Sequence, residues 1–223
     1  MTRESELLAK DEIIEVFRYL EEVFGIEVET ELDYYNHYQL VVAIMLSAQM
    51  TDKGVNRVSG KLFSLIKSPE DALNIGIDGI NDIIKSVNYH NVKSEHIFEM
   101  SKQLVERYNS TVPNNFEDLM ALKGVGRKTA NLVLSIAFQQ NRIAVDTHCF
   151  RVANRLGIVK AKNTFEAEQQ LSNNVPKQKH REINSLLISL GRRYCRAINP
   201  KCEQCGLKKL CKFYNNNKRK SEI

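Results

Sequence analysis

The feature that most constrains the fold is a glycine-containing segment in the middle of the chain, residues 122–130, with the sequence LKGVGRKTA. Gly124 and Gly126 stand one residue apart, so the backbone can make a tight turn that a Cβ atom would obstruct. A short apolar segment precedes the turn. A longer one follows it at helical spacing and contains Ala130, Val133, Leu134, Ala137 and Phe138. The segment therefore predicts a helix–hairpin–helix.

A turn of this kind can bind an anion. Its amides, and those in the first turn of the following helix, would point outward, where they can donate to a phosphate. Contacts of this type to backbone phosphates position a duplex without reading its base sequence. A plain glycine turn between two core helices is the alternative. The length of the motif favours DNA binding.

Lys128 falls in the first turn of the second helix of this hairpin. A cation there opposes the helix dipole, and Arg127 beside it adds repulsion between like charges. Partial burial would act in the same direction. Each effect favours the neutral amine, which is the form that a nucleophilic lysine needs. A lysine that only binds phosphate is the alternative.

Asp146 stands before a third informative segment, in the sequence AVDTH. It precedes a helix whose apolar stripe ends at Gly157, so it is a natural N-cap. A carboxylate at a helix N-terminus is also held ionised, ready to stabilise a developing cation or to assist proton transfer. Both interpretations stay open. His148 and Cys149, which follow in the same helix, are expected to be structural, with Cys149 a buried small hydrophobe.

Four of the five cysteines lie within seventeen residues, as Cys195-x6-Cys202-x2-Cys205-x5-Cys211. In an intracellular chain such a group more often holds a metal than two disulfides. Structural zinc usually takes two close cysteine pairs, whereas here only Cys202 and Cys205 are close. Four thiolates on a short loop can surround an iron–sulfur cluster, which is wider than one ion. The spacing favours the cluster and leaves zinc as the alternative.

Composition and patterning indicate an all-α protein. Four prolines and ten glycines among 223 residues favour helices over strands, and no segment shows convincing strand alternation. The longest apolar stretch, residues 40–46, is far short of the roughly 20 residues of a membrane span, and the N-terminus has no apolar signal region. An intracellular protein is expected. Helices are predicted over residues 11–25, 37–48, 69–75, 78–87, 91–108 and 116–122, with another opening at Thr51 and Asp52.

Charge is distributed unevenly along the chain. Residues 1–35 carry three basic and eleven acidic side chains, whereas residues 190–223 carry ten basic and two acidic ones. A basic end on a moderately basic body suits a polyanionic partner such as nucleic acid. A solvated basic tail is the alternative.

In four separated blocks the chain resembles the endonuclease III family of DNA glycosylases, which belongs to the helix–hairpin–helix superfamily. The blocks are LSAQMTDKGVN (46–56), LKGVGRKTANLVL (122–134), AVDTHCFRVANRLG (144–157) and the cysteine loop (195–211). The resemblance runs from about residue 36 to Cys211. It implies an all-α fold of two helical domains with a DNA-binding cleft between them. The implied domains are a six-helix domain of residues 30–140 and a second of residues 1–29 and 141–223.

The same resemblance implies roles for individual residues. Lys128 corresponds to the catalytic lysine and Asp146 to the catalytic aspartate. Gln49 resembles the residue that enters the space left by an extruded base, and Tyr89 stands where a wedge residue is expected. The hairpin would contact DNA through Gly124, Val125, Gly126, Arg127 and Thr129. The family's cysteine loop has the spacing seen here and holds a [4Fe–4S] cluster, which implies as ligands Cys195, Cys202, Cys205 and Cys211.

The implied activity is that of a bifunctional DNA glycosylase and AP lyase in base excision repair. Such an enzyme excises oxidised pyrimidines from duplex DNA through a lysine Schiff base and cuts the strand 3′ to the abasic site by β-elimination. The implied partner is double-stranded DNA with damaged bases or abasic sites. A cytoplasmic monomer without membrane attachment is expected. Retention of both Lys128 and Asp146 is the feature that indicates lyase activity.

The chain departs from the family pattern next to the expected wedge. Many members have Gly, then an apolar or aromatic residue, then Tyr, where this chain has Asn88, Tyr89 and His90. Met50 follows Gln49 where a smaller residue is common, and the chain has no Trp. Two alternatives stay open: a glycosylase with altered lesion specificity, or a non-catalytic DNA-binding or redox-sensing protein that keeps the hairpin and the cluster.

Overall fold

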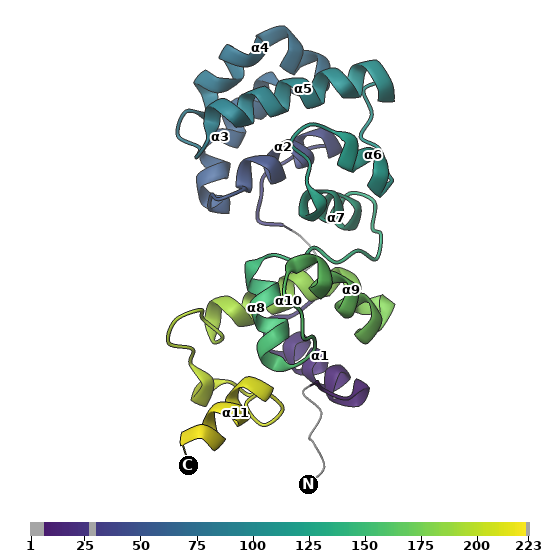
Figure 1. Cartoon of the computed structure of the whole chain (residues 1–223). Coiled ribbons are helices and arrows are strands. Elements are labelled where there is room, and N and C mark those ends of the chain that lie inside the picture. The colour runs from purple at the N-terminus through teal and green to yellow at the C-terminus, as the bar shows by residue number, and fades with distance from the viewer. Residues whose placement is uncertain (1–6, 27–29, 222–223) are drawn as a thin grey trace. The chain divides into compact units, whose positions relative to one another are not determined.

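All regular elements in the described part of the chain are helices. The structure is a computed structural model that describes residues 7–26 and 30–221. Figure 1 shows α-helices α1 to α11 and no strand within those residues, so the all-α prediction is confirmed. The chain divides into two compact units, one of residues 29–140 and one of residues 1–28 together with 141–223.

The unit of residues 29–140 is built around one helix that is apolar on every side. Its helices are α2 (His37–Ser47), α3 (Asp52–Leu65), α4 (Pro69–Ile84), α5 (His90–Tyr108), α6 (Phe116–Ala121) and α7 (Arg127–Ile136). Residues 40–46 of α2 are at most 5% exposed, as a helix without a polar face requires. The longest apolar stretch of the chain is therefore the centre of a core. No helix of the described residues is long and apolar enough to cross a membrane.

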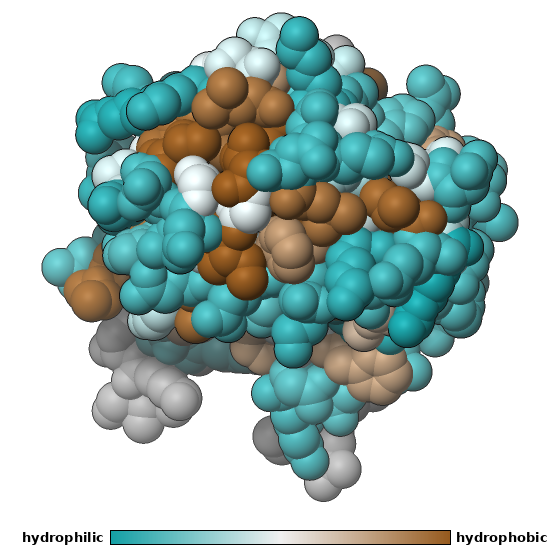
Figure 2. Space-filling view, turned by 90° about the horizontal axis from the view of Figure 1, so that it is seen from above, coloured by the Kyte–Doolittle hydropathy of each residue, from teal (hydrophilic) through white to brown (hydrophobic). Residues whose placement is uncertain are grey.

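Helices α4 and α5 lie side by side in this unit (Figure 1). The sequence predicts two segments, 69–75 and 78–87, and α4 likewise consists of two helical segments that meet at a kink at Gly76. Gly76 has a φ of 70°, a left-handed backbone that glycine adopts without a Cβ clash. The two helices bury Ile80, Ile84, Ile97, Met100 and Leu104 completely. Figure 2, a view from above, shows apolar side chains on the outer surface as well, framed by hydrophilic ones.

Side-chain caps set the start of several of these helices. Thr51, predicted to open a helix, caps α3 through its hydroxyl, which accepts from the amide of Gly54 at 3.2 Å. Asn36 and Asn115 cap α2 and α6 in the same way. Each cap satisfies one amide that the helix itself leaves without a partner.

The unit of residues 1–28 and 141–223 is packed around α8 and α10. Its helices are α1 (Lys10–Phe24), α8 (Thr147–Leu156), α9 (Thr164–Asn174), α10 (His180–Arg193) and α11 (Lys212–Ser221), with 3-10 turns at Lys177–Lys179 and Cys202–Gln204. The core is formed by apolar side chains of α1, α8 and α10: Ile13, Phe17, Leu20, Val152, Leu156, Ile183, Leu187 and Leu190. Gly191 lets α10 approach α8 closely, since a Cβ there would lie 3.2 Å from Val152 Cγ2.

Candidate active site

The predicted helix–hairpin–helix is present as α6, a turn of residues 122–126, and α7. The turn is anchored in the core by Leu122 and Val125, which are 3% and 5% exposed. The amide of Val125 donates to the carbonyl of Leu122 at 3.1 Å. That amide is therefore used inside the turn and is not among those that point outward, so Val125 acts as an anchor of the hairpin.

The two glycines of the turn have different roles. Gly124 has a φ of 77°, and a Cβ atom there would lie 2.7 Å from Met45 Cε and 2.8 Å from His96 Cβ. Both the backbone and the close packing against α2 and α5 require glycine at this position. Gly126 has a φ of −93°, and no atom lies within 4 Å of where its Cβ would be. Gly126 is thus open to the outside, while Gly124 shapes the turn.

Helix α7 begins without a side-chain cap. Its N-cap is Gly126, which has no side chain to accept from the first amides, in contrast to Asn115 at α6 and Asp146 at α8. Uncapped first-turn amides at the positive end of a helix dipole form a ready site for an anion. Beside them, Arg127 lies 4.9 Å from the centre of the Phe116 ring and Thr129 is half-buried.

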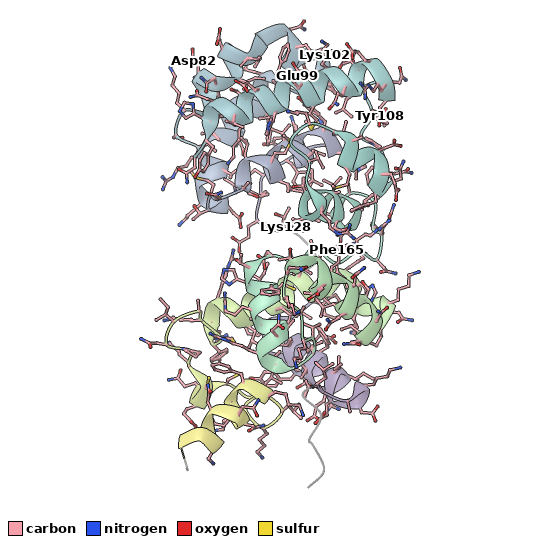
Figure 3. The ribbon with its side chains drawn as sticks, in the orientation of Figure 1. Asp82, Glu99, Lys102, Tyr108, Lys128 and Phe165 are labelled. Carbon is pink, nitrogen blue, oxygen red and sulfur yellow. The ribbon has the colours of Figure 1, made fainter. Side chains whose placement is uncertain are left out.

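Lys128 lies in this first turn of α7 and is exposed (Figure 3). Within the described residues its ammonium makes no ion pair and no hydrogen bond. The partial burial that the sequence interpretation considered is not found, because the side chain is exposed. The side chain is free to reach an electrophile that approaches the hairpin.

Asp146 is the N-cap of α8, as its position predicts. Its carboxylate accepts from the amide of Cys149 at 2.7 Å, and the side chain is half-buried. His148 Nδ1 lies 3.1 Å from an Arg151 nitrogen, and Cys149 is fully buried. The capping role is therefore confirmed, whereas a catalytic role for the second carboxylate oxygen stays a prediction. Lys128 belongs to the unit of residues 29–140, and Asp146 belongs to the other unit.

Gln49 and Tyr89 are brought together within one unit. Both are exposed, and both have a left-handed backbone, with φ of 56° and 60°. Asn88 Nδ2 donates to the carbonyl of Gln49 at 2.7 Å. The loop that carries Gln49, between α2 and α3, therefore lies next to the loop that carries the exposed ring of Tyr89, between α4 and α5.

A buried lysine supports this arrangement. Lys93 is 7% exposed, and its ammonium donates to the carbonyls of Leu46 and Ala48, both at 2.7 Å. These carbonyls end α2, where a cation is favourable. Burial lowers the pKa of Lys93. A role for Lys93 was not predicted from the sequence, although the spacing of this residue to Ile97, Met100 and Leu104 places it on the buried stripe of α5.

The four clustered cysteines are free thiols on one loop. Cys195, Cys202 and Cys205 are half-buried and Cys211 is 9% exposed. Burial raises the pKa of the Cys211 thiol to about 11, and the nearby Cys195 and Cys205 add to this. Burial likewise raises the pKa of Cys202 and Cys205, again with neighbouring cysteines contributing. Among the described residues, no group of three or more His, Cys, Asp or Glu side chains is arranged to hold a metal ion.

Arg155, in the last turn of α8, holds the cysteine loop in place. It donates to the carbonyls of Arg196 at 2.6 Å and Ala197 at 3.0 Å. Its guanidinium also lies 4.7 Å from the centre of the Phe213 ring and 3.7 Å from Cys195 Sγ. The loop is therefore shaped by side chains of the surrounding helices without any disulfide.

The family of the chain follows from its sequence. The model of the HhH-GPD superfamily of base excision DNA repair proteins matches residues 42–177, which include the hairpin, Lys128 and Asp146. The chain belongs to this superfamily.

Named relatives and solved structures agree with this assignment. Endonuclease III of Haemophilus influenzae is 43% identical over 184 residues, which are 82% of this chain and 87% of that protein. Endonuclease III of Bacillus subtilis is 44% identical over 185 residues, 82% of this chain and 84% of that protein. A trapped endonuclease III–DNA covalent intermediate has a TM-score of 0.89 and 34% identity, covering 96% of this chain and all of that one. A thermostable thymine-DNA glycosylase has a TM-score of 0.80 and 25% identity, covering 93% and 97%.

Proposed function

We propose that the protein is a bifunctional DNA glycosylase and AP lyase of base excision repair that removes oxidised pyrimidines. The single observation that carries this proposal is the position of Lys128, an exposed lysine with no ion pair or hydrogen bond among the described residues, in the first turn of a hairpin helix that has no side-chain cap. The similarity to an endonuclease III captured as a covalent intermediate with DNA supports a nucleophile on this fold.

The hairpin would hold the DNA backbone. The amides at the start of α7, from which no N-cap side chain accepts, can donate to one phosphate, and the space next to Gly126 allows that phosphate to approach the backbone. Arg127 and Thr129 flank the same turn, while Gly124 and Val125 give it its shape. Contacts of this kind fix the register of the duplex without reading its sequence.

Base removal would use Lys128 as the nucleophile. A damaged nucleotide is extruded at modest cost because the lesion already stacks or pairs poorly. The neutral amine of Lys128 attacks C1′ as the glycosidic bond breaks, and the base leaves with the bonding electrons and is protonated. Asp146 would stabilise the positive character of the sugar in the transition state. The product is a covalent bond between the Lys128 nitrogen and C1′.

Strand cleavage follows from that bond. The linked sugar opens to a Schiff base, whose cationic nitrogen acidifies the hydrogens on C2′. Loss of one of these hydrogens expels the 3′ phosphate by β-elimination and cuts the strand. Hydrolysis of the remaining imine then releases Lys128. Gln49 and Tyr89 would enter the duplex where the nucleotide has left.

The four loop cysteines fit a [4Fe–4S] cluster better than a single zinc ion. None of the four forms a disulfide, each of Cys202, Cys205 and Cys211 interacts electrostatically with another cysteine of the loop, and four thiolates on a short loop can surround a cluster, which is wider than an ion. Cys195, Cys202, Cys205 and Cys211 would be its ligands. The bound cluster would contribute no bond-making chemistry at the sugar and would fix the loop, together with Arg155.

Metal analysis tests this assignment. Protein purified without chelators should be yellow-brown, absorb at about 400 nm and contain about four irons per chain. Cys205→Ala should lose most of the iron and colour, because it removes one of four thiolates. The control Cys149→Ala, a buried cysteine outside the loop, should retain both. A colourless protein that contains stoichiometric zinc would contradict the assignment.

The proposed activity is tested on a panel of duplexes that carry an oxidised pyrimidine, an oxidised purine, a preformed abasic site or no lesion. We expect base release and strand cleavage with the oxidised pyrimidine, strand cleavage with the abasic site, and neither with undamaged DNA. Salt-sensitive binding without cleavage of any duplex would instead support a non-catalytic DNA-binding protein.

A further inference from the structure

We propose that Asn88 is a positioning residue. It links the loop between α2 and α3, which carries Gln49, to the loop between α4 and α5, which carries Tyr89. Gln49 and Tyr89, the two probe residues, then enter DNA as one preorganised unit. This inference rests on the proposed function. It concerns a residue that differs from the glycine common in the family, and the contact that Asn88 makes connects two segments 39 positions apart.

Both probe residues have a backbone that their side chains disfavour. Gln49 follows α2 with a φ of 56°, and Tyr89 precedes α5 with a φ of 60°. A residue with a Cβ keeps a left-handed backbone only where its surroundings enforce it. Both side chains are exposed, so burial in a core does not account for these two backbone conformations.

Hydrogen bonds fix each loop from its own side. Lys93 holds the end of α2 through Leu46 and Ala48. On the other side, Asn81 of α4 contacts both His90 Nδ1, at 2.6 Å, and Asn91, at 3.0 Å. The first turn of α5 is thereby fixed next to Tyr89.

At the surface, Asn88 connects the loop after α2 to the loop before α5. Its Nδ2 donates to the carbonyl of Gln49 itself at 2.7 Å, and it immediately precedes Tyr89 in the chain. A carbonyl held in this way fixes the peptide plane after Gln49 and so restricts the direction of the Gln49 side chain. A glycine at residue 88 could not make this contact, because it has no side chain.

Preorganisation of this kind accelerates a reaction rather than stabilising the fold. Asn88 is exposed, so water can replace its hydrogen bond in the folded protein at little cost. In the complex with DNA, however, freely moving probe residues must be ordered before the nucleotide can leave the stack, which lowers the rate. Loss of the Asn88 contact should therefore reduce extrusion and leave thermal stability nearly unchanged.

The test uses the full chain with Asn88→Ala and Asn88→Asp, the second of which keeps the shape but cannot donate. Single-turnover base release from the duplex with an oxidised pyrimidine should fall by about tenfold in both, the equivalent of one hydrogen bond. The emission of 2-aminopurine placed opposite the lesion, which reports unstacking, should rise less than with the unaltered protein. The midpoint of thermal unfolding should not move.

Two further variants separate positioning from other effects. Ser86→Asp adds a negative charge at an exposed side chain two positions before Asn88 and changes none of the hydrogen bonds described above, so base release should change less than twofold. In a Gln49→Ala background the probe side chain is already absent, so adding Asn88→Ala should cost less than a further twofold.

The outcomes are distinct. Equal losses from Asn88→Ala in the presence and absence of the Gln49 side chain would overturn the coupling, and so would equal losses from Asn88→Asp and Ser86→Asp. Either result leaves the proposed function intact, because the unaltered protein still releases the base. An unaltered protein that releases no base from any lesion duplex would overturn both proposals.

Discussion

Lys128→Ala is expected to abolish the covalent complex that borohydride traps between the protein and DNA containing an oxidised pyrimidine. Borohydride reduces the Schiff base between the lysine nitrogen and the sugar, and alanine has no amine to form that bond. Strand cleavage should fall on the order of 10³-fold or more, as for loss of a nucleophile in other enzymes. Trapping is measured by the shift of labelled DNA in a denaturing gel.

Lys123→Ala is the matched control for this variant. Lys123 is an exposed lysine of the same hairpin, five positions before Lys128, and its backbone contact to Gln103 survives the change. Loss of one positive charge should weaken binding to the duplex modestly and leave trapping intact once the DNA is saturated. Undiminished trapping in Lys128→Ala would show that another amine is the nucleophile.

Asp146→Asn is expected to slow base release on the order of 10²- to 10⁴-fold, since a neutral amide cannot stabilise the cationic sugar or assist proton transfer as a carboxylate does. Its effect on stability should be small, because asparagine caps a helix about as well as aspartate. The amide of Cys149 would still find an oxygen acceptor. Single-turnover base release and thermal unfolding measure the two effects separately.

A second capping residue in the same unit supplies the control. Asn163 caps α9 by accepting from the amide of Glu166 at 2.8 Å. Asn163→Ala should cost about 1 kcal/mol of stability without slowing base release. If Asp146→Asn leaves both the rate of base release and the midpoint of thermal unfolding nearly unchanged, then Asp146 is only a cap.

Local signals predicted the helices well where the sequence contains start and stop residues. Asp146 and Gly157 bracket α8, and the structure begins and ends this helix at those caps. Thr51 opens α3, and the apolar spacing after Gly126 appears as α7. These helix limits depend on contacts between residues that are close in the sequence. A periodic apolar pattern and a capping residue are therefore enough to predict them.

Contacts between distant segments could not be predicted in this way. Lys93 binds carbonyls 47 and 45 positions away, and Asn88 binds one 39 positions away. Only the tertiary fold brings these partners together. The internal hydrogen bond of the Val125 amide was missed for a different reason: the motif indicates which amides belong to the turn, but their directions depend on its backbone angles.

Helix α8 connects two chemically separate parts of the molecule. Its first turn is capped by Asp146, and its last turn carries Arg155, which donates hydrogen bonds to two carbonyls of the cysteine loop. A helix of ten residues is a rod about 15 Å long, and Gly191 of α10 presses directly against its side. A distortion of the cysteine loop that moves Arg155 would therefore also shift the opposite end of α8, where the carboxylate proposed to act on the sugar is located.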